Sequence, residues 1–198
     1  MSGEAARSRR LILRAGENGE DVLEDFCTDL GWPRRSEHVE DRENWNPRQI
    51  VWGAGPGLLL HFQQDLLSDV QYVFVQGQDP KAVEAVTALC EEKLPVWTPD
   101  SLLGAVDEAR DADDRAYALH QLGVGAPREF DQSVFSRITE AMRSTDVDLQ
   151  ETAIWAVTFE PWPEYTHPLR NVLDAAPDGP LSATVRNLLA EMAKERNA

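Results

Sequence analysis

Cysteine is scarce in this sequence. The chain has only 2 cysteines among its 198 residues, and two cysteines do not make the disulfide framework of a small secreted domain. Cys27 lies in EDFCTDL and Cys90 in VTALCEEKL, both rich in helix formers, where a free thiol usually behaves as a small buried hydrophobe. We expect both thiols to be reduced and structural, although a bridge is geometrically possible if their two helices pack together.

Long hydrophobic runs are absent from the sequence. Near the N-terminus, arginines precede the apolar residues 11–13, and Arg14 ends this run. Three apolar residues are too few for a signal peptide, and no stretch approaches the roughly 20 residues of a transmembrane helix. We therefore expect a cytoplasmic protein that does not bind membranes.

The sequence also lacks a diagnostic motif for catalysis or metal binding. Its 4 histidines are far apart and none lies at ligand spacing from another, so a zinc site lacks its ligand set. The glycine-rich stretch 53–57 has neither the lysine nor the following helix of a phosphate-binding loop. An acidic cluster around His38 has the chemistry for a hard divalent cation, but a solvated loop is the favoured interpretation. We expect no catalytic residue, no metal site and no cofactor.

Positive charge is scarce as well. The sequence has 19 lysine and arginine residues against 35 aspartates and glutamates, which gives a formal net charge of −16. Such a field repels nucleic-acid phosphates and anionic lipids and attracts basic partners. One interpretation is that the charge serves solubility, and the other is that it serves a basic protein partner. We do not expect nucleic-acid binding.

The composition is typical of a folded protein, and the sequence divides into two halves. Hydrophobic residues make up 42% of the chain, including 6 tryptophans and 6 phenylalanines, which is typical of a globular fold. A proline-containing connector around Thr98 separates residues 1–98 from residues 99–198. We predict an α+β fold class, with a small α+β domain first and an all-α domain of about three helical hairpins second.

The first half shows the pattern of an α-β-β-β-α unit. Amphipathic spacing predicts a helix over 20–30, and Asp79-Pro80 marks the start of a second helix that ends at Pro95. Alternating β-branched and aromatic residues predict a three-stranded antiparallel meander between them. The predicted strands are 49–54, 57–63 and 70–77. We expect the first fourteen residues to be frayed or to form a short edge strand, and residues 34–47 to be a loop.

The second half shows the pattern of one helical hairpin repeated about three times. Its apolar residues fall at helical spacing, and an aspartate-containing stretch opens each second helix. Phe135, Ile138 and Met142 on one first helix correspond to Leu169, Val172 and Ala176 on the next. On the second helices, Leu149 corresponds to Leu181, and an earlier, looser copy contains Leu103, Val106, Ala116, Leu119 and Leu122.

These residues resemble the consensus positions of HEAT-type repeats, which are α-solenoids built from antiparallel helix pairs. The resemblance covers about half of the chain and implies a stacked array that serves as a binding surface. An ordinary helical subdomain with accidental spacing is the alternative. Some HEAT-like proteins are DNA glycosylases with a basic concave face, but residues 129–198 contain twelve acidic and six basic residues. The resemblance therefore does not extend to that activity.

Aspartates at the starts of the second helices form the first candidate site. If the hairpins stack, equivalent positions superpose and these aspartates line up along one edge. N-capping explains one aspartate per helix. The surplus at Asp111, Asp113 and Asp114 is what capping does not require, and it predicts an acidic ridge that binds a partner. The candidate residues are Asp111, Asp113, Asp114, Asp146 and Asp148, with Asp178 at the third hairpin.

The connector FEPWPEYTHP, between the second and third hairpins, is the second candidate site. It contains three prolines and three aromatic residues. Stiff prolines favour outward presentation of Trp162 and Tyr165 between Glu160 and Glu164, which suits a basic protein. The alternative is that Trp162 folds back and covers the end of the hairpin.

We hypothesise a non-enzymatic acidic protein that binds a basic protein. Small acidic cytoplasmic proteins of this build resemble bacterial immunity proteins, which implies that the chain occludes a basic, nuclease-type toxin. An adaptor or scaffold subunit of a multiprotein complex is one alternative. A small-molecule enzyme is another, with a pocket between the sheet and the first hairpin and with His61, Asp65 and Tyr72 near its mouth. The sequence leaves the oligomeric state open.

Overall fold

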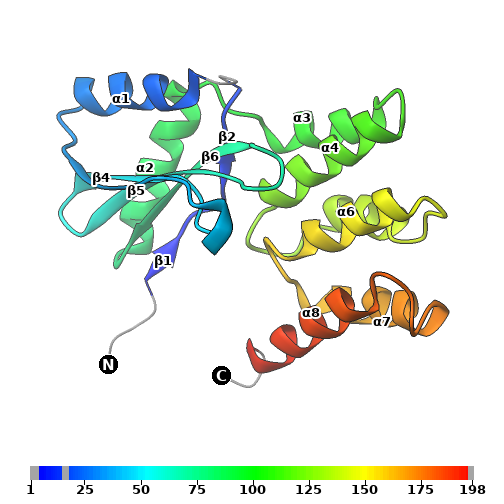
Figure 1. Cartoon of the computed structure of the whole chain (residues 1–198). Helices are drawn as coiled ribbons and strands as arrows, with labels where there is room; N and C mark the ends of the chain where they lie inside the picture. The colour runs from blue at the N-terminus through cyan, green and yellow to red at the C-terminus, as the bar shows by residue number, and fades with distance from the viewer. Residues whose placement is uncertain (1–4, 15–17, 196–198) are drawn as a thin grey trace. The chain divides into compact units, whose positions relative to one another are not determined.

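The computed structural model describes residues 5–14 and 18–195. The chain divides into two compact units, Met1–Thr98 and Pro99–Ala198 (Figure 1). The first unit combines an antiparallel sheet with helices, and the described residues of the second unit form helices without strands. The predicted mixed α+β class is therefore confirmed. None of the described helices has the length and apolar character needed to cross a membrane.

Three long strands form the centre of the sheet in the first unit. They are β4 (Gln49–Gly55), β5 (Leu58–Gln64) and β6 (Gln71–Gly77), and each pairs antiparallel with the next. Gly55 and Gly57 have φ values of 135° and 72° in the turn between β4 and β5, which a residue with a Cβ atom rarely adopts. The predicted antiparallel meander is present in the structure.

The sheet is wider than the sequence predicted. β3 (Arg34–His38) pairs with β4 at one edge, and β1 (Ala6–Arg7) and β2 (Leu11–Ile12) both pair with β6 at the other. The prediction of a loop over 34–47 is wrong for its first five residues, because RRSEH has no apolar alternation to mark a strand. The N-terminal segment forms edge strands where it is described, and residues 1–4 lie outside the described part.

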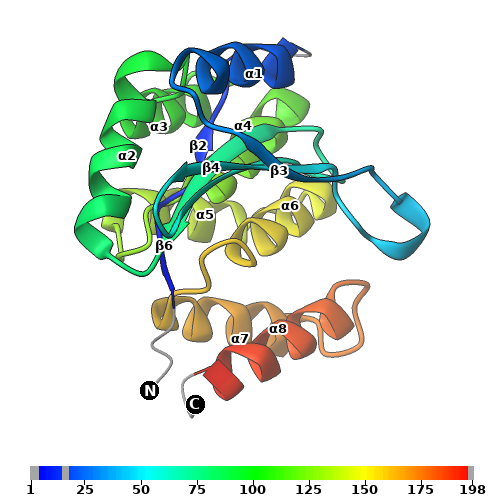
Figure 2. The same ribbon diagram turned by 90° about the vertical axis from the view of Figure 1, so that its left-hand side faces the viewer.

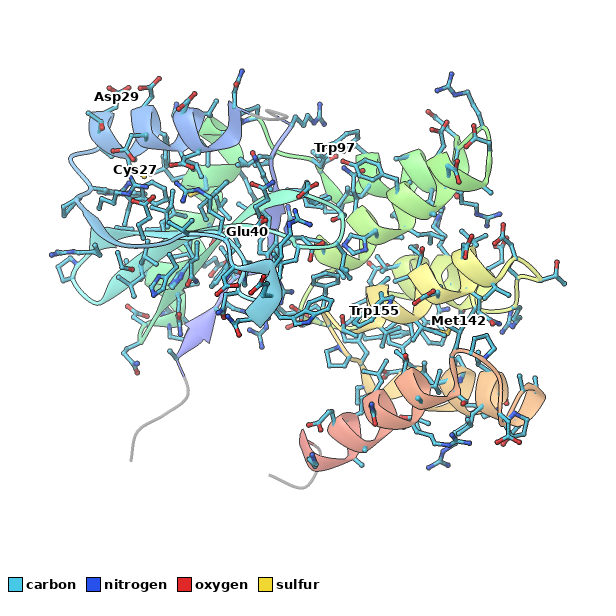
Figure 3. The ribbon with its side chains drawn as sticks, in the orientation of Figure 1. Cys27, Asp29, Glu40, Trp97, Met142 and Trp155 are labelled. Carbon is cyan, nitrogen blue, oxygen red and sulfur yellow. The ribbon has the colours of Figure 1, made fainter. Side chains whose placement is uncertain are left out.

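Helices α1 (Gly19–Asp29) and α2 (Pro80–Lys93) pack on one face of the sheet. The core of this unit includes Cys27 from α1, Cys90 from α2 and Trp52 from β4. Both cysteines are free and buried, and Figure 3 shows Cys27 between α1 and the sheet. Burial raises the pKa of each thiol to about 12, so both remain protonated at neutral pH.

The described part of the second unit contains six α-helices in three consecutive pairs. The first pair is α3 (Pro99–Asp107) and α4 (Ala112–Val124), the second is α5 (Gln132–Ala141) and α6 (Val147–Val157), and the third is α7 (Thr166–Ala175) and α8 (Ser182–Glu195). The helices of each pair pack together, and α4 also packs on α6. The turns within the three pairs lie along one edge of this unit (Figure 1).

A glycine allows α4 and α6 to approach closely. A Cβ atom on Gly123 of α4 would lie 2.6 Å from the Cβ and 2.7 Å from the Cα of Ala156 on α6. Real Cβ contacts are longer than this, so any side chain at position 123 would push the two helices apart. The pairing of a glycine with an alanine therefore sets the spacing between the first and second helix pairs.

Candidate partner-binding surfaces

Two aspartates of the predicted ridge are N-caps. The Asp111 carboxylate accepts a hydrogen bond from the backbone N–H of Asp114 at 2.8 Å and caps α4. Asp146 accepts from the N–H groups of Asp148 and Leu149 at 3.0 and 3.3 Å and caps α6. An aspartate is favoured here because it satisfies free helix N–H groups and opposes the helix dipole. Capping accounts for one carboxylate per helix, as the sequence indicated, but Asp111 is the cap of α4 and is not part of the surplus in which it was predicted.

The surplus aspartates are exposed in the first turns of the same helices. Asp113 and Asp114 follow the cap of α4, and Asp148 follows the cap of α6. The Arg110 guanidinium lies 3.2 Å from the Asp114 carboxylate, but its side chain is 87% exposed, so solvent screens this pair strongly. Arg115 forms its ion pair with Glu140 of α5 at 2.8 Å. The helix ends therefore present more negative charge than capping uses.

The turns bring these carboxylates to one edge of the second unit. Because the turns within the three helix pairs lie along the same edge (Figure 1), the two aspartate clusters at α4 and α6 share it. Asp178 lies in the turn of the third pair, four positions before α8 begins at Ser182, and it is exposed. We call this set the acidic edge, and its members are Asp111, Asp113, Asp114, Asp146, Asp148 and Asp178.

The aromatic residues of the connector are not on the surface. Trp162 is 5% exposed and Tyr165 1%, and their rings stack with centroids 5.5 Å apart. The Trp162 indole N–H donates to the carbonyl of Arg128 at 3.3 Å. Phe130 packs edge-on against Trp162, and Phe135 packs against Tyr165. The connector thus folds back over the start of α5, which is the alternative arrangement.

The prediction that this connector presents its aromatic side chains outward is therefore wrong. Glu160 is also buried, at 8% exposure, and burial raises the pKa of the Tyr165 hydroxyl. Glu164 alone among the four connector residues proposed for binding is exposed. The aromatic side chains gain more by removal from water against Phe130 and Phe135 than by exposure. Trp162, Tyr165 and Glu160 support the fold and are not available to a partner.

The three residues of the enzyme hypothesis have structural partners in the sheet. The His61 ring stacks on Phe74 with centroids 4.5 Å apart, and burial lowers its pKa. The Tyr72 hydroxyl donates to Gln63 at 2.7 Å. The Asp65 carboxylate accepts from backbone N–H groups of its own turn. These contacts are typical of a packed sheet face and a tight turn, and they give the enzyme hypothesis no support.

Hollows in the second unit lie beside its last helix. One of about 370 Å³ is lined by Trp155, Pro161, Leu188 and Met192, and one of about 340 Å³ shares Pro161 and Met192 with it. Figure 3 shows Trp155 on the side of α6 that faces α8. Both hollows are partly open to solvent. Within the described residues, no group of three His, Cys, Asp or Glu side chains is placed to bind one metal ion.

Three exposed apolar side chains are not among the residues predicted from the sequence. Val39, Trp45 and Leu67 are 73%, 66% and 52% exposed, which places them among the most exposed large hydrophobic residues that the structure describes. Val39 and Trp45 lie in the segment between β3 and β4, and Leu67 lies in the turn between β5 and β6. A single tryptophan in the polar stretch ENWNP was the available signal, because an isolated aromatic in a loop has no periodic partner to bury it.

Comparisons with known proteins leave the family open. No family model matches the chain, no curated protein is significantly similar to its sequence, and no solved structure is significantly similar to its fold.

Proposed function

We propose that this chain is a non-enzymatic binding protein whose acidic edge binds a basic protein. The observation that carries the proposal is the surplus of exposed carboxylates at the starts of α4 and α6, on an edge common to three helix pairs. Carboxylates beyond those that cap the helices weaken the fold slightly through mutual repulsion. A partner with complementary charge would offset this repulsion, so binding such a partner would give a function to the carboxylates that do not cap a helix.

We further propose that the helix pairs are a HEAT-type array. Three consecutive pairs, with their internal turns on one edge, are the arrangement that such an array requires. In an array of this kind, equivalent positions of successive pairs form a continuous surface. The acidic edge would then be a repeated feature of the array, with contributions from each turn.

The specific role that we propose is that of an immunity protein for a nuclease-type toxin. A nuclease binds the phosphates of its substrate with basic residues, so a row of carboxylates complements its active cleft. The chain would inhibit by occlusion, with carboxylates where substrate phosphates would lie. Opposite charges would also speed the encounter of the two proteins at low ionic strength.

The test begins with capture of the partner from the native organism, followed by kinetics on the purified pair. We expect the captured protein to be basic and its nuclease activity to be blocked by the chain. Replacing Asp113→Lys and Asp148→Lys together should lower the association rate constant by about tenfold at low salt, because steering depends on local charge. Stopped-flow mixing over a range of ionic strengths measures this effect.

The matched control reverses two exposed carboxylates of α1, with Asp25→Lys and Asp29→Lys. It changes the net charge by the same amount and leaves the acidic edge intact. An equal loss in both double variants would show that only net charge matters and would remove the acidic edge from the proposal. Capture of a complex whose members have no basic toxin would favour the adaptor hypothesis instead.

A further inference from the structure

The segment between β3 and β4 is a closed loop with its own hydrogen bonds. The backbones of Asp41 and Asn46 exchange N–H···O bonds of 2.9 and 3.0 Å. The Asp41 carboxylate also accepts from the backbone and side-chain nitrogens of Asn44, at 3.2 and 2.7 Å, and these bonds lower its pKa. Figure 2 shows this segment extending beyond the strands of the sheet. The loop is thus ordered although little of it is buried.

The neighbouring turn between β5 and β6 is equally well defined. The Asp65 carboxylate accepts from the backbone N–H of Leu67 at 3.0 Å and from the N–H and hydroxyl of Ser68 at 2.9 and 2.8 Å. The backbone N–H of Asp65 also donates to the carbonyl of Val70 at 2.9 Å. The exposed Leu67 side chain is therefore carried by a fixed backbone.

Arg42 joins the loop to the turn. Its guanidinium donates to the carbonyl of Leu66 at 3.0 Å and to the carboxylate of Asp69 at 2.8 Å, and it also pairs with Glu40 of its own loop. Glu40 is labelled in Figure 3. A guanidinium suits this position because its planar fork can serve several acceptors at once. The loop residues 39–48 and the turn residues 65–69 therefore form one surface, which we call the Trp45 tip.

The Trp45 tip exposes apolar side chains that the fold does not use. Val39, Trp45 and Leu67 are all more than half exposed, whereas Trp162 and Tyr165 of the connector are buried. Trp45 also has a left-handed backbone, with φ 55° and ψ 34°, which is rare for a bulky residue. Large apolar groups on a rigid backbone lose little entropy on binding, and tryptophan is among the residues most enriched at the centres of protein interfaces.

The charges around these side chains specify the kind of partner. The tip carries five carboxylates, and both of its arginines are already paired: Arg42 with Glu40 and Asp69, and Arg48 with Glu20 and Glu37 outside the tip. The carboxylates belong to Glu40, Asp41, Glu43, Asp65 and Asp69. A second copy of the chain would bring two acidic rims together, so self-association through this surface is disfavoured. A partner therefore needs both apolar surface and cationic side chains to complement the tip.

We propose that the Trp45 tip is a docking site for a basic protein surface in which lysine or arginine side chains flank apolar ones. The indole face of Trp45 receives a cationic side chain by a cation–π contact, and the carboxylates of the rim pair with neighbouring cations. Val39 and Leu67 cover the alkyl stems of those side chains. This inference rests on the proposed function for the class of partner, but it assigns binding to the first unit, apart from the acidic edge.

The test uses two defined peptides and the full chain. One peptide alternates arginine and leucine over seven residues, and the other has glutamate in place of arginine. Titration is followed by the indole ¹⁵N–¹H signals, with the Trp45 signal assigned by its loss in Trp45→Ala. We expect the arginine peptide to shift the Trp45 signal saturably and Trp45→Ala to weaken binding at least tenfold. Tyr117→Ala, at another exposed aromatic residue, should bind within twofold of the unchanged chain.

Several outcomes would overturn the inference. They are an unmoved Trp45 signal, equal binding of the glutamate peptide, or unchanged affinity in both Trp45→Ala and Leu67→Ala. Leu67→Ala serves as the second variant on the other side of the tip, in case Trp45→Ala disturbs the loop. A concentration-dependent dimer in sedimentation that Trp45→Ala abolishes would replace the basic partner by a second copy.

The variants also separate this inference from the proposed function. The acidic-edge variant Asp113→Lys with Asp148→Lys should bind the arginine peptide at the tip like the unchanged chain. If the tip variants leave capture of the basic partner unaffected while the acidic-edge variant loses it, the proposed function stands and the tip is not its docking site. If no variant affects a captured partner, both are wrong.

Discussion

Trp162 shows how one side chain can organise a connector. Its ring is in contact with Tyr165 and Phe130, and its indole N–H reaches the carbonyl of Arg128. Arg128 and Phe130 lie more than thirty positions before Trp162 in the sequence, and Tyr165 lies in the connector itself. The orientation of Trp162 therefore depends on tertiary packing, and local sequence could not decide it.

Removing this ring should destabilise the second unit. We expect Trp162→Ala to lower the free energy of unfolding by about 3–5 kcal/mol, because a buried aromatic leaves a large cavity. Trp45→Ala is the control, since an exposed tryptophan changes stability by no more than about 0.5 kcal/mol. Urea unfolding followed by far-UV circular dichroism measures the stability of both variants. Equal losses of unfolding free energy would contradict a buried Trp162 and an exposed Trp45.

His61 should make the stability of the first unit depend on pH. Burial lowers the pKa of His61 in the folded chain. As the pH falls below about 6.5, His61 therefore becomes protonated in the unfolded chain before it does in the folded chain. The stability contributed by neutral His61 is therefore complete above that pH and is lost on acidification. The His61→Phe variant retains the ring stacked on Phe74 without the titration. Between pH 7.5 and 5.5, we expect the unchanged chain to lose more unfolding free energy than the variant, and parallel losses would contradict this.

Two helix glycines give a prediction for element packing. Gly123→Ala should lower the free energy of unfolding by about 1–3 kcal/mol, because its Cβ atom would overlap Ala156 and force α4 from α6. A Cβ atom on Gly104 of α3 would point into open space, with no atom beyond its own stretch of helix within 4 Å. Gly104→Ala should therefore raise the free energy of unfolding by about 0.5–1 kcal/mol, because alanine has the higher helix propensity. Urea denaturation of both variants tests the difference, and a gain in both would refute the close approach.

The elements differ in how far the sequence could predict them. The alternation of Val and aromatic residues predicted β6, and amphipathic spacing predicted α1 within one residue at each end. β3 had no such signal, because its stability comes from backbone pairing with β4 and from ion pairs such as that of Arg34 with Glu37. Only tertiary structure supplies the β4 partner. The charged side chains also protect this edge strand from pairing with other chains.

The candidate sites were predictable to different degrees for a similar reason. N-capping is a local interaction, so the presence of one capping aspartate per helix followed from sequence. Which aspartate is the cap depends on where each helix begins, and Asp111 was wrongly counted with the surplus. The burial of Trp162 and the exposure of Trp45 depend on which distant residues approach them, and the sequence could not distinguish the two. The Trp45 tip further depends on Arg42, whose acceptors Leu66 and Asp69 lie in another turn.

At the scale of the whole molecule, the negative charge belongs to both units. Residues 1–98 contain seventeen acidic and ten basic residues, and residues 99–198 contain eighteen and nine. A basic partner would therefore be attracted from a distance by the entire chain and oriented by local clusters. The rate difference between the acidic-edge variant and its α1 control belongs to this scale, and it should shrink as salt reduces the Debye length.

The opposite surroundings of Trp45 and Trp162 would give two separate optical signals in a variant that keeps only these two of the six tryptophans. An indole in water emits at longer wavelength than one packed among aromatic rings, so each ring reports a different event. Emission from Trp45 would respond when a partner covers it, while emission from Trp162 would respond when the helices come apart. Such a variant would distinguish partner binding from unfolding without an attached dye.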